Sequence, residues 1–153
     1  MPNTYTQIYV QIVFAVKGRQ NLISENIREK VEKYICGIIS NKNSKPLAIY
    51  CNPDHIHILI GLDSSTSVSD IARDIKANSS KWINEQKMVS GKFNWQEGFG
   101  AFTYSKSQID SVVKYILNQP VHHKTISFKD EYTDFLKKFE IEYDEKFLFN
   151  WIK

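Results

Sequence analysis

The sequence predicts an α+β domain built on an antiparallel sheet of the split β-α-β type, as in ferredoxin-like and RRM-like proteins. Apolar patterns with strand and helix periods follow one another in the order β-α-β-β-α-β, and further helical patterns come after them. No repeat, low-complexity tract or Pro/Gly-rich linker interrupts the 153 residues. We therefore expect a single domain over residues 1–153, with two helices on one face of the sheet and the other face available for a ligand or a partner.

The first half of the chain contains three expected strands and one helix. Apolar and polar residues alternate within residues 5–16, which is the pattern of a strand with one buried face. Ser24 can cap a helix whose apolar residues recur with the 3.6-residue period. Strands are then expected over residues 47–51 and 55–62, because a turn of sequence Asn-Pro-Asp separates two apolar runs.

The second half continues with a helix that begins at Ser67 or Ser69 and carries Trp82 on its buried side. A short strand over residues 101–104 follows two glycines, and a helix over residues 108–119 has Ser107 as its capping residue. A helical tail is expected over residues 128–153, with its helix ending near Phe139.

Composition and charge restrict the class of protein. Apolar residues make up 42% of the chain, the net charge is +3, and residues 128–153 are net acidic while the preceding body is net basic. This balance permits a nucleic-acid partner without demonstrating one. No apolar run is long enough to cross a bilayer, the N-terminus does not resemble a signal peptide, and two cysteines form no disulfide framework. We expect a cytoplasmic protein with no membrane partner.

Two histidines stand in one of the most apolar runs, DHIHILI. Alternation places Ile56 and Ile58 on the core face, and His55 and His57 side by side on the other. Two neutral imidazoles at this spacing can bind one metal ion, although isolated pairs are more often ordinary, half-buried sheet residues. A third ligand must come from elsewhere, and spacing alone does not choose among the candidates Cys51, His122, His123 and the scattered carboxylates.

Tyr115 and Gln119 form a second candidate group. They are four residues apart on an expected helix, so the phenol and the amide project from one helical face. Alone this pattern is weak, because a rim aromatic followed by a polar residue at a helix end is common.

The two groups together resemble the HUH superfamily. More narrowly, the chain resembles the single-tyrosine transposases of bacterial insertion sequences, which are related to the REP-associated tyrosine transposases. The resemblance runs from about Tyr5 to Phe149 and no catalytic position departs from it. Its main stretches are VQIVFAVKGR, DHIHILIGL, IKANSSKWIN, WQEGFGAFTYSKSQID and VVKYILNQPVHHK.

The resemblance implies a mechanism and its residues. His55, His57 and Gln119 would bind a divalent ion, Mg²⁺ or Mn²⁺, that polarises and orients a scissile phosphate. Tyr115, on the C-terminal catalytic helix, would attack single-stranded DNA and form a 5′-phosphotyrosine link with a free 3′-OH. Because the link conserves the phosphodiester, a second 3′-OH can reverse the step without ATP.

The resemblance also implies partners. The DNA would carry the hairpin ends of the protein's own mobile element, in the bacterial cytoplasm and at the nucleoid when bound. A homodimer is expected, in which the tyrosine helix of one subunit acts in trans on the metal site of the other, with Gly98 and Gly100 in a segment that repositions it. Our candidates for phosphate contacts are Arg19, Arg73, Lys76 and Lys81.

Four alternatives remain open at this point, one of them a domesticated, inactive transposase, since motifs do not prove turnover. Tyr104 is a rival nucleophile, although Gln108, four residues on, follows the expected Ser107 cap and so shares no helical turn with it. An HUH replication initiator or relaxase would usually be larger. A catalytically silent nucleic-acid-binding module of RRM type would carry aromatic residues on the central strands, where only Tyr9 is clearly on the expected open face.

Overall fold

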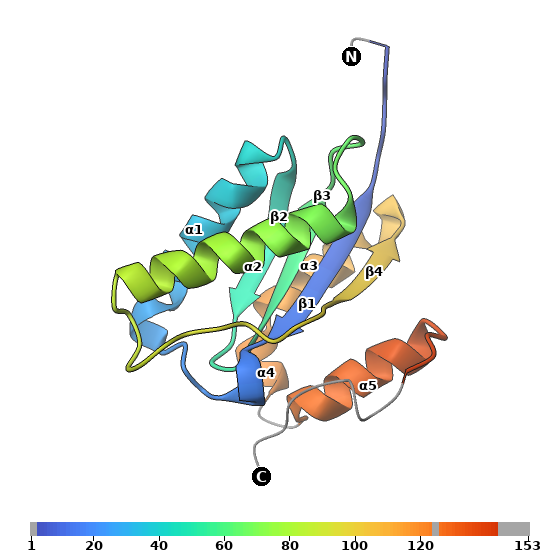
Figure 1. Cartoon of the computed structure of the whole chain (residues 1–153). Helices are drawn as coiled ribbons and strands as arrows, with labels where there is room; N and C mark the ends of the chain where they lie inside the picture. Colours follow the sequence, from blue (N-terminus) through green and yellow to red (C-terminus); the bar gives the residue numbers. More distant parts are fainter. Residues whose placement is uncertain (1–2, 124–125, 144–153) are drawn as a thin grey trace.

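The sheet confirms the predicted fold class. The computed structural model describes residues 3–123 and 126–143 of the chain (Figure 1). Four strands form an antiparallel sheet in the order β2-β3-β1-β4. Their bounds are Tyr9–Ala15 for β1, Lys45–Cys51 for β2, His55–Gly61 for β3 and Gly100–Tyr104 for β4. The central pair, β1 and β3, sets Ile12 opposite Ile58 and Val13 opposite His57.

Two long helices cover the first face of the sheet, α1 (Glu25–Asn41) and α2 (Val68–Glu85). The isoleucines of β3 and the alternate apolar residues of β1 are buried beneath them, as predicted. The Ser67 side chain accepts a hydrogen bond from the Asp70 N–H, so Ser67 is the cap of α2. No helix in the described part of the chain is both long and apolar enough to cross a membrane.

The second face is covered as well, where we expected it to be available for a ligand. The helix α3 (Ile109–Leu117) lies behind the sheet in Figure 1, and α5 (Phe128–Lys138) lies beside it towards β4. Each brings an apolar stripe that only this face can bury. The stripe of α3 packs on β2 and β3, and that of α5 packs on β1 and β4.

Several element bounds differ from the prediction. The expected helix over 108–119 is three pieces, because a 3-10 turn at Lys106–Gln108 leads into α3, and Gln119 begins a separate short helix, α4 (Gln119–His122). Ser105 caps the turn in a reciprocal pair with Gln108, where we had expected Ser107. A second 3-10 turn, Lys17–Arg19, follows β1. Of the expected tail, α5 ends at Lys138 and residues 144–153 lie outside the described part.

Gly100 allows α5 to approach the sheet closely. A Cβ atom at this position would lie 2.6 Å from the Tyr132 hydroxyl and 2.8 Å from a carbon of its ring. The Tyr132 ring is buried against Phe102 in the cluster under α5. The absence of a side chain at Gly100 is therefore a packing requirement, whereas Gly98 serves a left-handed backbone position with φ of +80°.

Replacing Gly100 with alanine should destabilise the protein by about 1–3 kcal/mol, because overpacking displaces the Tyr132 ring and α5 with it. The matched control is Gly37→Ala in α1, where nothing lies within 4 Å of the new Cβ. Alanine there should stabilise the helix by about 0.5–1 kcal/mol. Urea unfolding measures both, and equal stability of the two variants would contradict the packing role.

Candidate active site

Both histidines of β3 are buried on the second face, with exposures of 1% for His55 and 0% for His57. The Nδ1–H of His55 donates to Asp54 Oδ1 at 2.7 Å. The Nδ1–H of His57 donates to Gln11 Oε1, on the neighbouring strand, at 2.8 Å. These bonds leave the Nε2 lone pairs as acceptors, and Asn52 Nδ2 donates to that of His55 at 3.1 Å. Held tautomers of this kind are typical of metal-binding histidines.

Tyr115 and Gln119 lie beside the histidine pair within the same chain. The rings of Tyr115 and His57 have centroids 5.9 Å apart. Gln119 is fully buried, and its Oε1 accepts a hydrogen bond of 3.1 Å from Asn52. One chain therefore brings together the residues that sequence analysis had assigned to two subunits.

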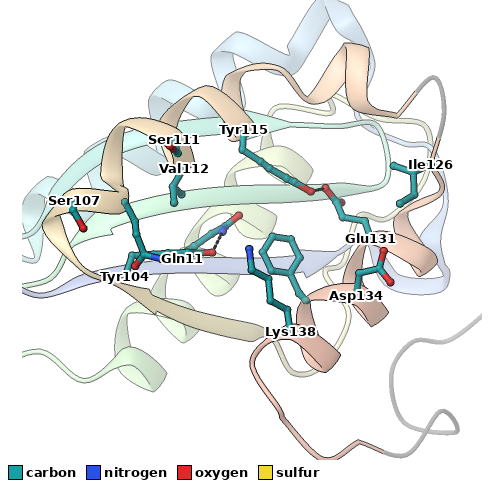
Figure 2. Close-up of a pocket in the computed structure, with 12 residues that line it drawn as sticks. Gln11, Tyr104, Ser107, Ser111, Val112, Tyr115, Ile126, Glu131, Asp134 and Lys138 are labelled. Atoms are coloured by element: carbon teal, nitrogen blue, oxygen red, sulfur yellow. Dashed lines mark hydrogen bonds between the residues drawn. The ribbon is translucent and has the colours of Figure 1, made fainter.

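The side chain at the centre of this group is Glu131 of α5, which sequence analysis missed. Its Oε1 lies 3.1 Å from His57 Nε2, 3.0 Å from His123 Nε2 and 3.6 Å from His55 Nε2. Its Oε2 accepts hydrogen bonds from the Tyr115 hydroxyl and, at 3.1 Å, from Gln119 Nε2. Figure 2 shows the Tyr115 hydroxyl pointing at this carboxylate from across the space between α3 and α5.

Sequence patterns contain a signal for Glu131. It lies on the apolar stripe of α5, with the same helical face as Phe128, Tyr132 and Phe135, where an acidic residue is out of place. His123 was one of several open candidates for a third ligand. It is half-buried, with its Nδ1–H donating to the Ile126 carbonyl at 2.9 Å. The side chain of His122 lies outside the described part.

Burial and charge shift the acid–base behaviour of the cluster. Burial would raise the pKa of Glu131, but its close contacts with the rings of His123, His55 and His57 outweigh burial and hold that pKa far below the usual carboxylate value. Burial lowers the pKa of His57 in spite of Glu131. Burial and the negative charge of Glu131 raise the pKa of Tyr115 well above that of a free phenol. At neutral pH the cluster therefore contains an ionised carboxylate and a protonated phenol.

The donor set fits a divalent cation. One ligand atom from each of His55, His57, His123 and Glu131 lies within 4.8 Å of the others. The Nδ1–H groups of His55 and His57 donate to other residues, so the Nε2 lone pairs of both rings face the same carboxylate oxygen of Glu131. These electron pairs would repel one another, and a cation bound between them would remove that repulsion. Gln119 directs its NH₂ group at Glu131, and a 180° rotation of the side-chain amide would direct its oxygen there instead.

The residues predicted to contact DNA do not join this cluster. Arg73, Lys76 and Lys81 are on α2, which covers the opposite face of the sheet. Arg73 forms ion pairs with Asp70 and Asp74. Lys76 donates to the backbone carbonyls of Gln96 and Gly98, and burial lowers its pKa to about 8. Lys81 is exposed, and the side chain of Arg19 lies outside the described part.

Trp82 and Tyr104 are two aromatic residues for which the sequence predicted a position or a role. The Trp82 ring stacks on Tyr34 of α1, with centroids 4.3 Å apart, so it packs between the helices as expected. The hydroxyl of Tyr104, the rival nucleophile, accepts a hydrogen bond of 2.7 Å from Gln11 Nε2. A single residue, Gln11, therefore connects the Tyr104 hydroxyl to His57 by hydrogen bonds.

Comparison with known proteins gives separate evidence on the family of this chain. A family model described as transposase IS200 like matches residues 4–119. No curated protein matches the sequence. A candidate transposase from Deinococcus radiodurans R1 superposes with a TM-score of 0.61 at 17% identity, over 76% of this chain and 94% of its own. A REP-associated tyrosine transposase bound to a REP hairpin superposes with a TM-score of 0.59 at 17% identity, over 81% and 73%.

At this identity the two structures show a shared fold alone, while the family model covers most of the sequence. Its range includes the histidine pair, Tyr115 and Gln119, and it stops before α5. The chain therefore belongs to the family of IS200-like transposases, in the single-tyrosine class that the sequence motifs had predicted.

Proposed function

We propose that this transposase cleaves and rejoins single-stranded DNA at the hairpin ends of its own mobile element, through a 5′-phosphotyrosine at Tyr115. One observation carries the proposal: Tyr115, Gln119 and both histidines of β3 converge on a single point inside one chain. The similarity to a structure bound to a REP hairpin supports DNA hairpins as the substrate.

The histidines and Glu131 are the residues that would hold a divalent ion, Mg²⁺ or Mn²⁺, with Gln119 or His123 completing the set. When bound, the ion supplies Lewis-acid polarisation of the scissile phosphate. Nitrogen ligands favour Mn²⁺ over Mg²⁺ in such a mixed set. Asp54 and Gln11 keep the two imidazoles oriented by their bonds to Nδ1.

Tyr115 provides the nucleophile. Its hydroxyl donates to Glu131, which orients the phenolic oxygen, and the hydroxyl gives up its proton as the bond between the tyrosine oxygen and phosphorus forms. The bond from phosphorus to the 3′ oxygen then breaks, and this oxygen takes up a proton as a free 3′-OH. A 3′-OH from another strand reverses the step, releases Tyr115 and seals the new junction.

The tyrosine acts in cis in this proposal. All of the converging side chains belong to one chain, and no second copy is needed to place the Tyr115 hydroxyl at the cluster. The homodimer with the tyrosine helix in trans stays a prediction from the sequence. A silent RRM-type module is disfavoured, because the sheet face that such modules use carries α3 and α5.

Replacing Tyr115 with phenylalanine should abolish covalent attachment to DNA, because it removes the attacking oxygen alone. The assay incubates the protein with labelled single strands from both flanks of its gene and Mn²⁺ or Mg²⁺, and follows the adduct on a denaturing gel. Tyr104→Phe is the matched control and should keep the adduct, at a lower rate, since it loosens Gln11. An adduct that survives Tyr115→Phe would overturn the assignment.

Mn²⁺ should stabilise the folded protein by about 2.7 kcal/mol at a hundredfold excess over its dissociation constant. His57→Ala and Glu131→Gln should each lose most of this increase in melting temperature, because the first removes a ligand atom and the second removes the negative charge of the cluster. Glu85→Gln, at an exposed carboxylate outside the cluster, should retain it. A shift of equal size in all four proteins would mean that the ion binds elsewhere.

Mixing two inactive variants distinguishes cis from trans action. Tyr115→Phe retains the metal cluster, and His57→Ala retains the nucleophile. In cis, neither chain has a complete site, so the mixture should stay inactive after unfolding and refolding together. Recovery of strand cleavage in the mixture would establish that the tyrosine helix acts in trans.

A further inference from the structure

A groove of about 530 Å³ lies between α3 and α5 and reaches the Tyr115 hydroxyl (Figure 2). Gln11 and Tyr104 of the sheet line it, together with Ser111 from α3 and Phe135 from α5. Glu131 lines it too, so the groove is continuous with the histidine cluster. Any strand whose phosphate meets Tyr115 must place a neighbouring nucleotide in or beside this space.

Phe135 gives the groove a flat aromatic wall. Its ring is half-buried and lies almost parallel to that of Tyr115, with an angle of 5° and centroids 5.7 Å apart. Phe102 stacks against Phe135 at 4.9 Å, which fixes the ring from the side of the sheet. A fixed aromatic ring at the edge of a groove is the kind of surface on which an unpaired base stacks.

Charge determines which part of a nucleotide the groove accepts. Besides Glu131, the groove is lined by Asp134, a carboxylate outside the histidine cluster that repels a phosphate. A nucleobase carries no net charge, so it can enter while its phosphate remains at the histidine side. Lys138, which also lines the groove, is available to the backbone of the same strand.

Tyr104 provides a hydrogen-bond donor inside the groove. Its oxygen accepts from Gln11 Nε2, so its own proton is left to donate, and no described residue accepts it within hydrogen-bond distance. Gln11 in turn accepts from His57. A base acceptor bonded to Tyr104 would therefore be linked through Gln11 to the orientation of a histidine in the cluster.

We propose that the α3–α5 groove binds one unpaired nucleobase flanking the cleaved phosphate, stacked on Phe135 and hydrogen-bonded by Tyr104. The inference rests on the proposed function and adds to it a protein-based reading of the strand next to the cleavage point. The ligand class is an unstacked base of single-stranded DNA.

The test uses the full chain in EDTA, so that binding is measured without cleavage. Single strands from the flanks of the gene carry 2-aminopurine, or an abasic site, at one position after another. One position should show strong quenching of 2-aminopurine, and an abasic site there should weaken binding about tenfold. Phe135→Leu should remove the quenching, and its affinity should be the same for the abasic and the intact strand. The substitution and the abasic site remove the same contact, so their effects on binding should not add.

Two matched controls keep the result interpretable. Phe99→Leu alters a half-buried aromatic residue outside the groove and should behave like the wild type. Ser111→Trp fills the groove from an exposed position and should reproduce Phe135→Leu, whereas Ser40→Trp, at an exposed position of α1, should not. Equal abasic sensitivity in wild type and both groove variants would overturn the proposal.

Strand cleavage of the same oligonucleotides with Mn²⁺ separates the two inferences. If strands are cleaved but no base position shows binding in the groove, the groove proposal is refuted and the proposed function is retained. Quenching that depends on Phe135, without cleavage of any strand, refutes the proposed function and retains the groove. Absence of binding to every strand refutes both.

Discussion

The carboxylate of Glu131 is the constraint on which the rest of this site depends. It is 3% exposed, and a buried charge of this kind is tolerated only with several compensating partners. Three imidazoles, a phenol and an amide surround it. They come from β3, α3, α4 and the residue that follows α4, so one charge on α5 fixes the relative positions of elements far apart in the sequence.

The sheet provides the rigid base for this arrangement. Gln11 lies on β1, next to the strand of His57, and the pairing of β1 with β4 brings Tyr104 within reach of its amide. A chain of side-chain hydrogen bonds therefore crosses three strands and ends on an imidazole. The helices on the second face close over it because their apolar stripes need the same face.

Strand and helix periods were sufficient to predict the order of elements, the buried isoleucines and the shared face of the two histidines. The helical period placed Tyr115 and Gln119 on one face, but only the resemblance to a family singled them out as nucleophile and ligand. The periods were insufficient for α5: its apolar stripe was visible, but nothing local says that the stripe packs on the second face and carries Glu131 into the cluster. Likewise, the partners of Gln11 and Asn52 depend on long-range pairing that no short motif encodes.

The alternation of β3 has a consequence for folding itself. A sheet paired one residue out of register would turn every side chain of this strand to the opposite face. His55 and His57 would then lie beneath α1 and α2 among apolar side chains, and three isoleucines would face Glu131. In such a misfolded state the two imidazoles would be buried without hydrogen-bond partners, and the charge of Glu131 would lose two of the groups that compensate it. The two histidines of the candidate site thus also mark the correct pairing, so the alternation of β3 both places the candidate metal ligands and penalises a shifted register.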